Sequence, residues 1–216
     1  MNEPRKTKSA VPRQKGETMN EPRKAKIERK TRETNITLEL NLDGKGLTEI
    51  KTPFGFFDHM ITAMAKHALF DLKLRAVGDV HIDAHHTVED VGIAFGLALA
   101  EALGDKRGIG RFGSAVTPMD EAVARAVVDL SGRPFLVYKV EIPERNQWEF
   151  DVNLLKEFFA AFAANARLTL HLKLEYGENY HHCSEAVMKA AGRALRSACE
   201  HDLRVKDVPS TKGSLA

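Results

Sequence analysis

The spacing of hydrophobic and polar residues alternates between two periods along residues 27–113. A period of two, which predicts β-strands, occurs in three short segments: 34–42, 47–52 and 71–78. Apolar residues at helical spacing occur in two longer segments: 56–70 and 85–104. The polar turn DGKG after the first strand predicts a hairpin with the second strand, and Gly104 is typical of a helix end.

The same order of elements returns in residues 114–207. Two strands about an SGRP turn, a helix, a strand and a final helix are predicted at 124–142, 151–166, 167–177 and 181–201. The motif HHTVE at 85–89 matches HHCSE at 181–185, 96 residues further along the chain. An internal repeat of this kind predicts two copies of one supersecondary unit that pack together.

The repeat predicts an α+β fold, a tandem repeat of two similar βαβ-type half-domains with the helices packed between two small mixed sheets. We assign the half-repeats to 27–113 and 114–207, and a C-terminal tail to 208–216. The leader at 1–26 has almost no large apolar side chains, and its opening MNEPRKTK recurs once as MNEPRKAK. We expect it to be disordered, because it cannot bury enough surface to offset the entropy of ordering.

Composition excludes several classes of protein. The chain has 216 residues, and its 32 basic residues nearly balance 30 acidic ones, so no strong field draws it to nucleic acid or to a membrane. No apolar run approaches the roughly 20 residues that span a bilayer. The two cysteines, Cys183 and Cys199, form no CxxC pair and favour a reducing compartment, so we expect a cytoplasmic protein.

The two histidine pairs are the clearest chemical signal. Residues i and i+4 share one face of a helix, so His85 lies with Glu89 while His86 points elsewhere. The repeated helix has the same arrangement in three residues: His181, Glu185 and His182. Each helix can therefore offer two ligands to one ion and a third ligand to another. Imidazole and carboxylate ligands without thiolates suit Mn, Fe, Co or Zn.

Two further histidines become candidates because of these pairs. His59 lies near the start of a predicted helix, and His171 lies in an alternating apolar strand where a polar ring is out of pattern. Either residue alone is typical of a structural histidine, but beside the pairs each can complete a set of metal ligands. His67 is a candidate for the lining of the same site.

Cations in turn-like segments indicate an anionic ligand. Arg111 lies in GIGRFG, Arg133 in SGRPF and Lys212 in PSTKGS, where backbone amides can assist anion binding. Each one alone is typical of a solvated surface charge. Together with a metal centre they indicate a phosphorylated substrate.

Six motifs in a fixed order resemble the imidazoleglycerol-phosphate dehydratase family, and the resemblance extends from about residue 27 to the C-terminus. The motifs are RKTRET (29–34), FFDHM (56–60), DAHHTVEDVGIAFG (83–96), LSGRPF (130–135), YHHCSEAVMKAAGRAL (180–195) and PSTKGSL (209–215). The resemblance implies a lyase of histidine biosynthesis that converts imidazole glycerol phosphate to imidazole acetol phosphate and water.

The resemblance further implies two Mn²⁺ ions per active site, which bind the substrate ring as imidazolate. One ion would take four ligands: His59, His85, Glu89 and His182. The other would take four more: His86, His171, His181 and Glu185. As Lewis acids, the metals would stabilise the charge that develops while the ring assists loss of hydroxide.

The resemblance also implies catalytic and substrate-binding residues. The catalytic set is Glu33, His86 and Glu185, with Glu33 as the proton-shuttling acid/base and the helix glutamates chiefly as ligands. The substrate-binding set is Glu33, His59, His67, His85, Glu89, Arg111, Arg133, His181, Ser210 and Lys212, of which the two arginines, the serine and the lysine grip the phosphate. Family members form a shell of twenty-four subunits with active sites at subunit contacts, and we expect such a homo-oligomer, without nucleic acid or membrane partners.

The chain departs from the family pattern in two places. Ile61, Thr62 and Ala63 stand where acidic and amide residues are common, and Cys183 and Ser184 replace an expected aliphatic pair. Neither change removes a proposed ligand. Two other interpretations stay open: a metal-dependent hydrolase of a phosphorylated small molecule, although the HExxH spacing is absent, and a non-catalytic protein whose metals bridge subunits.

Overall fold

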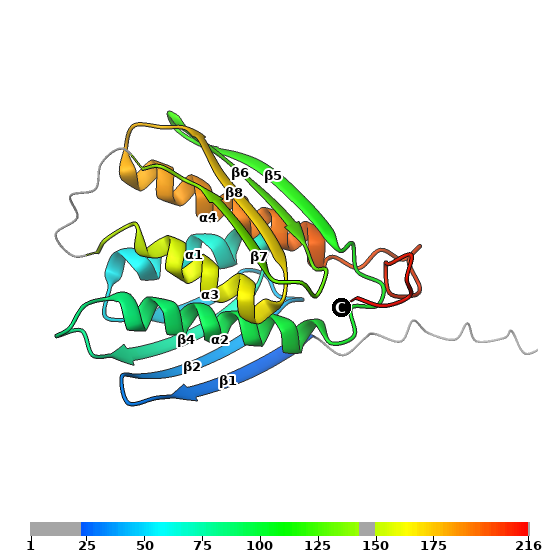
Figure 1. Ribbon diagram of the computed structural model, residues 1–216, viewed down its shortest axis with the longest axis horizontal. Coiled ribbons are helices and arrows are strands. Elements are labelled where there is room, and N and C mark those ends of the chain that lie inside the picture. The colour runs from blue at the N-terminus through cyan, green and yellow to red at the C-terminus, as the bar shows by residue number, and fades with distance from the viewer. Residues whose placement is uncertain (1–22, 143–149, 216) are drawn as a thin grey trace, which may run out of the picture.

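Two four-stranded sheets enclose four helices in the structure, a computed structural model that describes residues 23–142 and 150–215 (Figure 1). The first sheet has the spatial order β1 (Lys24–Lys30), β2 (Thr34–Asn41), β4 (Asp71–Gly78), β3 (Thr48–Lys51). The second has the order β5 (Phe112–Met119), β6 (Ala122–Asp129), β8 (Thr169–Tyr176), β7 (Phe135–Lys139). The helices are α1 (Gly55–Ala68), α2 (His85–Leu103), α3 (Leu154–Ala166) and α4 (Tyr180–Cys199).

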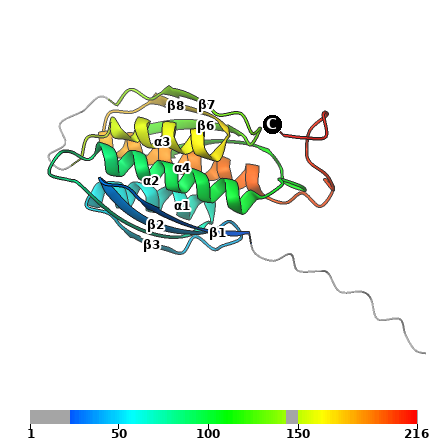
Figure 2. The ribbon, with the colours of Figure 1, turned by 60° about the horizontal axis from the view of Figure 1, so that its bottom comes forward.

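The two halves of the chain have the same topology. In each sheet the first two strands pair antiparallel, the second pairs antiparallel with the fourth in chain order, and the third pairs parallel with the fourth. Figure 2 shows the helices as a layer between the sheets. The predicted α+β fold, with two similar half-domains and helices between two mixed sheets, is confirmed.

The predicted hairpin between β2 and β3 is wrong. The chain passes through α1 after β3, and β4 then inserts between β2 and β3 as a central strand. The hairpin of this sheet joins β2 to β1 instead. The hydrophobic pattern missed β1 and β5 because both are edge strands: β1 is mostly charged, and β5 contains Gly113 and Pro118.

These edge strands move two expected boundaries. Lys24 already belongs to β1, so the leader does not extend to residue 26, and its residues 1–22 lie outside the described part of the chain. The second sheet begins with β5 at Phe112, two residues before the expected start of the second half. Both boundaries move because β1 and β5 are stabilised by backbone pairing and lack the alternating apolar pattern that would have revealed where they start.

Each pair of helices combines the two halves of the chain. α2 packs on α3 and α1 packs on α4, and the buried side chains form one continuous core. Glycines allow this close approach: a Cβ added at Gly96 would lie 2.6 Å from the Phe162 carbonyl oxygen, and one at Gly192 would lie 2.3 Å from the Met64 carbonyl oxygen. The halves therefore share a single core and depend on each other for burial.

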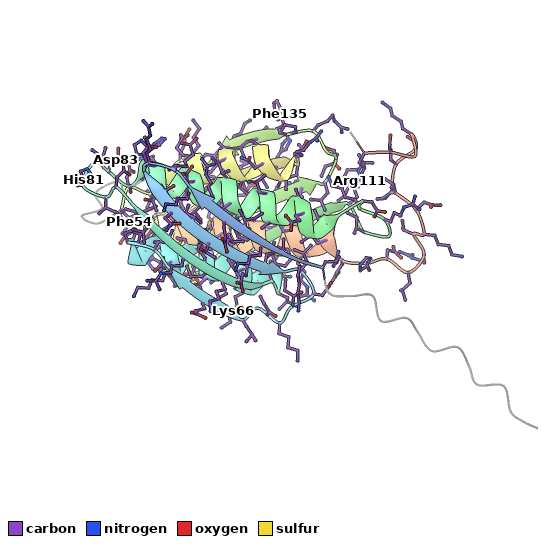
Figure 3. All side chains as sticks on the ribbon, turned by 90° about the horizontal axis from the view of Figure 1, so that it is seen from below. Phe54, Lys66, His81, Asp83, Arg111 and Phe135 are labelled. Atoms are coloured by element: carbon purple, nitrogen blue, oxygen red, sulfur yellow. The ribbon has the colours of Figure 1, made fainter. Side chains whose placement is uncertain are left out.

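All four helices begin at one end of the molecule (Figure 1). We call this the histidine end, because α2 and α4 begin there with their histidine pairs. The opposite end carries Arg111 and Arg133 and is called the arginine end. Figure 3 shows His81 and Asp83 at the former and Arg111 at the latter. Within the residues that the structure describes, no helix is long and apolar enough to cross a membrane.

Candidate active site

Three side chains at the histidine end converge on one point. His59 Nε2 lies 3.0 Å and His181 Nε2 lies 3.2 Å from the same oxygen of Glu185, Oε2. His59 comes from α1, and the other two residues are one turn apart on α4. One ligand atom from each lies within 4.8 Å of the others, and this is the one such group of three found in the described chain. We call these residues the α4 half-site.

The carboxylate of this half-site is buried and charged. Burial raises the pKa of Glu185, but hydrogen bonds from Lys189 and His59 outweigh burial and lower the pKa to about 2. Lys189 Nζ lies 2.6 Å from Glu185 Oε1, which leaves Oε2 to face the two imidazoles. Two ring nitrogens and a charged oxygen at this spacing fit a divalent cation of the manganese or zinc type. The sequence reading missed Lys189, although it lies four residues after Glu185 on the same helix.

On α2, the other helix with a histidine pair, the described part of the chain brings two candidate ligands together. His85 Nε2 lies 3.7 Å from Glu89 Oε2, as the i and i+4 spacing predicts. The internal repeat identifies a third residue, because α3 packs on α2 as α1 packs on α4. His59 and Glu157 each lie ten residues before the left-handed residue that ends their helix, which is Leu69 in α1 and Arg167 in α3. Glu157 is thus the counterpart of His59, and the register of the repeat was the signal that could have found it.

The second histidine of each pair points away from these groups and is held by a loop carboxylate. His86 Nδ1 lies 3.0 Å from Asp79, and His182 Nδ1 lies 2.7 Å from Glu121. Each hydrogen bond raises the pKa of its histidine, because the carboxylate stabilises the protonated ring. A carboxylate on Nδ1 also orients a ring whose Nε2 binds metal. Neither acidic residue was among the predicted site residues.

Within one chain, the structure groups the candidate ligands differently from the sets that the resemblance implies. His59 was grouped with His85 and Glu89, whereas the structure places it against His181 and Glu185. His171 was grouped with His181 and Glu185, but it is exposed on β8 between two leucines that face the helices. Because side chains alternate along a strand, His171 lies on the opposite face of the sheet from α4 and cannot reach those ligands within one chain.

Glu33 lies beside His86. It belongs to the turn between β1 and β2, and its Oε2 is 3.9 Å from His86 Nδ1. The turn is held on α2, because Arg29 Nη2 donates to Asp90 Oδ1 at 2.8 Å and the hydroxyl of Thr34 donates to the other oxygen of Asp90. An exposed carboxylate on a fixed turn next to a candidate ligand suits a proton-transfer role.

His67 lies farther along α1 than His59, two helical turns away. Burial lowers its pKa, and the positive charges of Lys189 and Arg193 add to this effect. The ring is therefore biased towards its neutral form. His67 therefore lies near Lys189, which pairs with Glu185 of the α4 half-site, but it is not one of the three converging residues.

The predicted phosphate residues gather at the arginine end. Arg111 Nε donates to Asp129 Oδ1 at 2.8 Å, and Arg133 Nη2 lies 3.7 Å from Asp129 Oδ2. Arg111 Nη1 donates to the Pro209 carbonyl oxygen at 2.8 Å and so anchors the tail that carries Ser210 and Lys212. Arg133 is 61% exposed at its side chain, which leaves its guanidinium open to an anion.

The candidate metal ligands and the candidate phosphate-binding residues of one chain lie far apart. The backbone N–H of Arg111 donates to the carbonyl oxygen of Ala198, near the C-terminal end of α4, while His181 lies at the start of that helix. At about 1.5 Å per residue, these two points of α4 are roughly 26 Å apart. One chain therefore holds both parts of the predicted site at opposite ends.

Comparison with known proteins identifies a family. The sequence profile described as imidazoleglycerol-phosphate dehydratase matches residues 52–195. The dehydratase of that name from Gluconobacter oxydans is 54% identical over 198 residues, which are 91% of this chain and 100% of the relative. The one from Acidiphilium cryptum is 57% identical over 194 residues, which are 89% of this chain and 99% of the relative.

Solved structures extend the likeness to the fold. The imidazoleglycerol-phosphate dehydratase of Staphylococcus aureus is 37% identical with a TM-score of 0.75, over 83% of this chain and 99% of its own. The enzyme from Pyrococcus furiosus, in complex with (S)-C348, is 40% identical with a TM-score of 0.76, over 88% of this chain and 100% of its own. The profile match, the identities and the shared fold together show that this chain belongs to the imidazoleglycerol-phosphate dehydratase family, hydro-lyases of histidine biosynthesis.

Proposed function

We propose that this dehydratase converts imidazole glycerol phosphate to imidazole acetol phosphate with two Mn²⁺ ions per active site. The observation that carries the proposal is the convergence of His59, His181 and Glu185 on one point. The donor set of imidazoles and carboxylates without thiolates suits manganese. When bound, the ions would supply Lewis acidity to the imidazole ring of the substrate.

The metal ligands follow from the internal repeat. The α4 half-site would hold one ion, and its counterpart, formed by His85, Glu89 and Glu157, would hold the other. His86 and His182 point away from both groups, so each would complete a half-site of a neighbouring copy. Their Nδ1 hydrogen bonds to carboxylates support this, because they leave Nε2 as the ligand atom.

The remaining residues bind the substrate and move its proton. The guanidinium of Arg133, together with Arg111, Ser210 and Lys212, would bind the phosphate through charge-assisted hydrogen bonds. Asp129 holds the two arginines side by side. Glu33 would carry the proton, while Glu89 and Glu185 serve chiefly as ligands.

The separation of the two ends supports an active site shared between copies. A phosphorylated imidazole is much shorter than the roughly 26 Å between the α4 half-site and the arginine end. The phosphate residues would therefore come from another copy than the metal ligands. The resemblance implies a closed shell of twenty-four copies. Such a shell would meet this need if the histidine end of every copy contacts the arginine end of another copy.

Removal and return of the metal test this function. Purified protein treated with a chelator should lose turnover of imidazole glycerol phosphate, and added Mn²⁺ should restore the enol-absorbing product. A hydrolase would instead release inorganic phosphate, and a non-catalytic assembly protein would yield no product while fully metallated. Either of those results would refute the proposal.

The role of Glu33 has a separate test. Glu33→Gln keeps the size of the side chain but removes its ability to take a proton, so kcat should fall by roughly 10²–10⁴-fold while both ions stay bound. Glu39→Gln, at an exposed position of β2, is the matched control and should keep wild-type turnover. Near-normal turnover by metallated Glu33→Gln would show that another group moves the proton.

A further inference from the structure

A largely buried ion pair lies where β1 packs on α2 in the first half of the chain (Figure 1). Arg29 Nη2 donates to Asp90 Oδ1 at 2.8 Å, and the side chain of Asp90 is 10% exposed. Burial of two charges carries a large desolvation cost, so such a pair stabilises a fold little compared with uncharged residues that fill the same space. The pair therefore calls for a reason other than stability.

The second half of the chain makes the same contact without charges. Arg29 is the sixth residue of β1 and Thr117 is the sixth residue of β5. Ala186 follows the motif HHCSE as Asp90 follows HHTVE. The hydroxyl of Thr117 donates to the carbonyl oxygen of Ala186 at 2.9 Å, so the same two positions of the repeat meet in both halves. The fold itself therefore does not need an ion pair at this place.

Two hydroxyl groups connect the ion pair to the backbone of Glu33. The Thr34 hydroxyl donates to the second oxygen of Asp90, and the hydroxyl oxygens of Thr34 and Thr31 lie 3.2 Å apart. Thr31 Oγ1 accepts from the backbone N–H of Glu33 at 3.1 Å. Because the one hydroxyl proton of Thr34 goes to Asp90, Thr31 donates to Thr34, and the chain of hydrogen bonds is continuous. We call Arg29, Thr31, Thr34 and Asp90 the α2 clamp.

The glutamate at the corresponding turn of the second half is held differently. Glu121 directly precedes the first residue of β6, as Glu33 directly precedes the first residue of β2. The carboxylate of Glu121 accepts from the backbone N–H groups of Glu178 and Asn179, and it lies 2.7 Å from His182 Nδ1. The side chain of Glu121 therefore fixes its turn directly on the start of α4, and that turn needs no buried clamp.

The carboxylate of Glu33 is not engaged in this way. Asp79 takes the contact with His86 Nδ1 at 3.0 Å, and Glu33 Oε2 stays 3.9 Å from the same nitrogen. A carboxylate that several donors hold takes up a proton less readily, so a group that carries a proton is better fixed through its backbone. The α2 clamp supplies that kind of support, because it ends on the backbone N–H of Glu33.

We propose that the α2 clamp positions Glu33 for proton transfer and is dispensable for folding. This inference rests on the role proposed for Glu33 above. The members of the clamp act through Glu33 and not on the substrate, so they are positioning residues. Because Asp90 directly follows the candidate ligand Glu89, the clamp keeps the turn of Glu33 at a constant distance from the helix that carries this ligand.

Replacement of the clamp by the residues of the second half tests this role. Ala122 opens β6 as Thr34 opens β2, so one triple variant installs the second-half residues at three clamp positions: Arg29→Thr, Thr34→Ala and Asp90→Ala. The variant should unfold near the wild-type temperature and keep both Mn²⁺ ions, whereas kcat should fall by roughly 10²-fold because Glu33 is displaced. Thr117→Val breaks the corresponding contact of the second half, and this matched control should keep wild-type kcat.

A second experiment asks whether the clamp acts through Glu33. In the Glu33→Gln background, the three substitutions should lower kcat by no more than about twofold further, because residues that act as one unit have non-additive effects. A general structural defect would instead multiply with the defect of Glu33→Gln. Thr34→Val keeps the ion pair and the shape of the side chain but breaks the chain at its hydroxyl. It should also lower kcat with both ions bound, though by less than the triple variant.

The outcomes separate the clamp from the proposed function. A folded, metallated triple variant with wild-type kcat would overturn the positioning role, and so would an undiminished further loss in the Glu33→Gln background. A triple variant that does not fold would show that the clamp is a structural requirement, which also contradicts the inference. With an active wild type, each of these results leaves the proposed function standing. A fully metallated wild type without turnover would refute the function itself.

Discussion

Two defective variants, His181→Ala and Arg133→Glu, should recover activity when their subunits are mixed. The first variant removes a ligand of the α4 half-site, and the second repels the substrate phosphate, so turnover by either protein alone should fall far below wild type at limiting substrate. His181 lies at the start of α4, whereas Arg133 shares Asp129 with Arg111, and Arg111 contacts Ala198 near the other end of that helix, roughly 26 Å away. A site that takes its metal end from one copy and its arginine end from another can therefore be intact in the mixture.

Random mixing sets the size of the recovery. In an equimolar mixture that is separated into subunits and reassembled with Mn²⁺, roughly a quarter of the shared sites combine a wild-type half-site with a wild-type arginine end. Turnover at limiting substrate should rise to about that fraction of wild type. His181→Ala mixed with Glu185→Gln is the control and should stay inactive, because both lesions fall in the same half-site. No recovery in verified mixed oligomers would mean that each chain builds its own complete site.

The second large effect is the loss of bound metal in His59→Ala. Without this imidazole the α4 half-site keeps only His181 and the buried charge of Glu185 from its own chain, so the protein should retain about one Mn²⁺ per chain instead of two. His171→Val is the matched control. It should keep both ions, because His171 lies on the outer face of the second sheet beside two valines.

Metal content per chain, measured after dialysis, checks this result independently of activity. Titration calorimetry with Mn²⁺ gives the number of sites by a second route. If His171→Val kept one ion, the ligand set implied by the resemblance would be right for His171. If His59→Ala kept both ions, His59 would not be a ligand in either grouping.

The helices with the histidine pairs were predicted correctly from sequence because their geometry is local. The i and i+4 spacing put His85 with Glu89 and His181 with Glu185, and the structure has both pairs within 3.7 Å. The strand at 71–78 and the helix closing on Gly104 were also found, since alternation and helix ends depend on neighbouring residues. The charged edge strand β1 was missed because backbone pairing leaves no hydrophobic pattern.

The sequence by itself therefore determined the repeat, the helices with their histidine pairs, and the kinds of ligand they offer. Only the tertiary structure decided which residues meet: His59 with Glu185, His171 on the far side of a sheet, and Arg111 a helix length from His181. The physical reason is that periodicity tells which residues share a face of one element, whereas the packing of α1 on α4 and the order of strands decide what that face contacts.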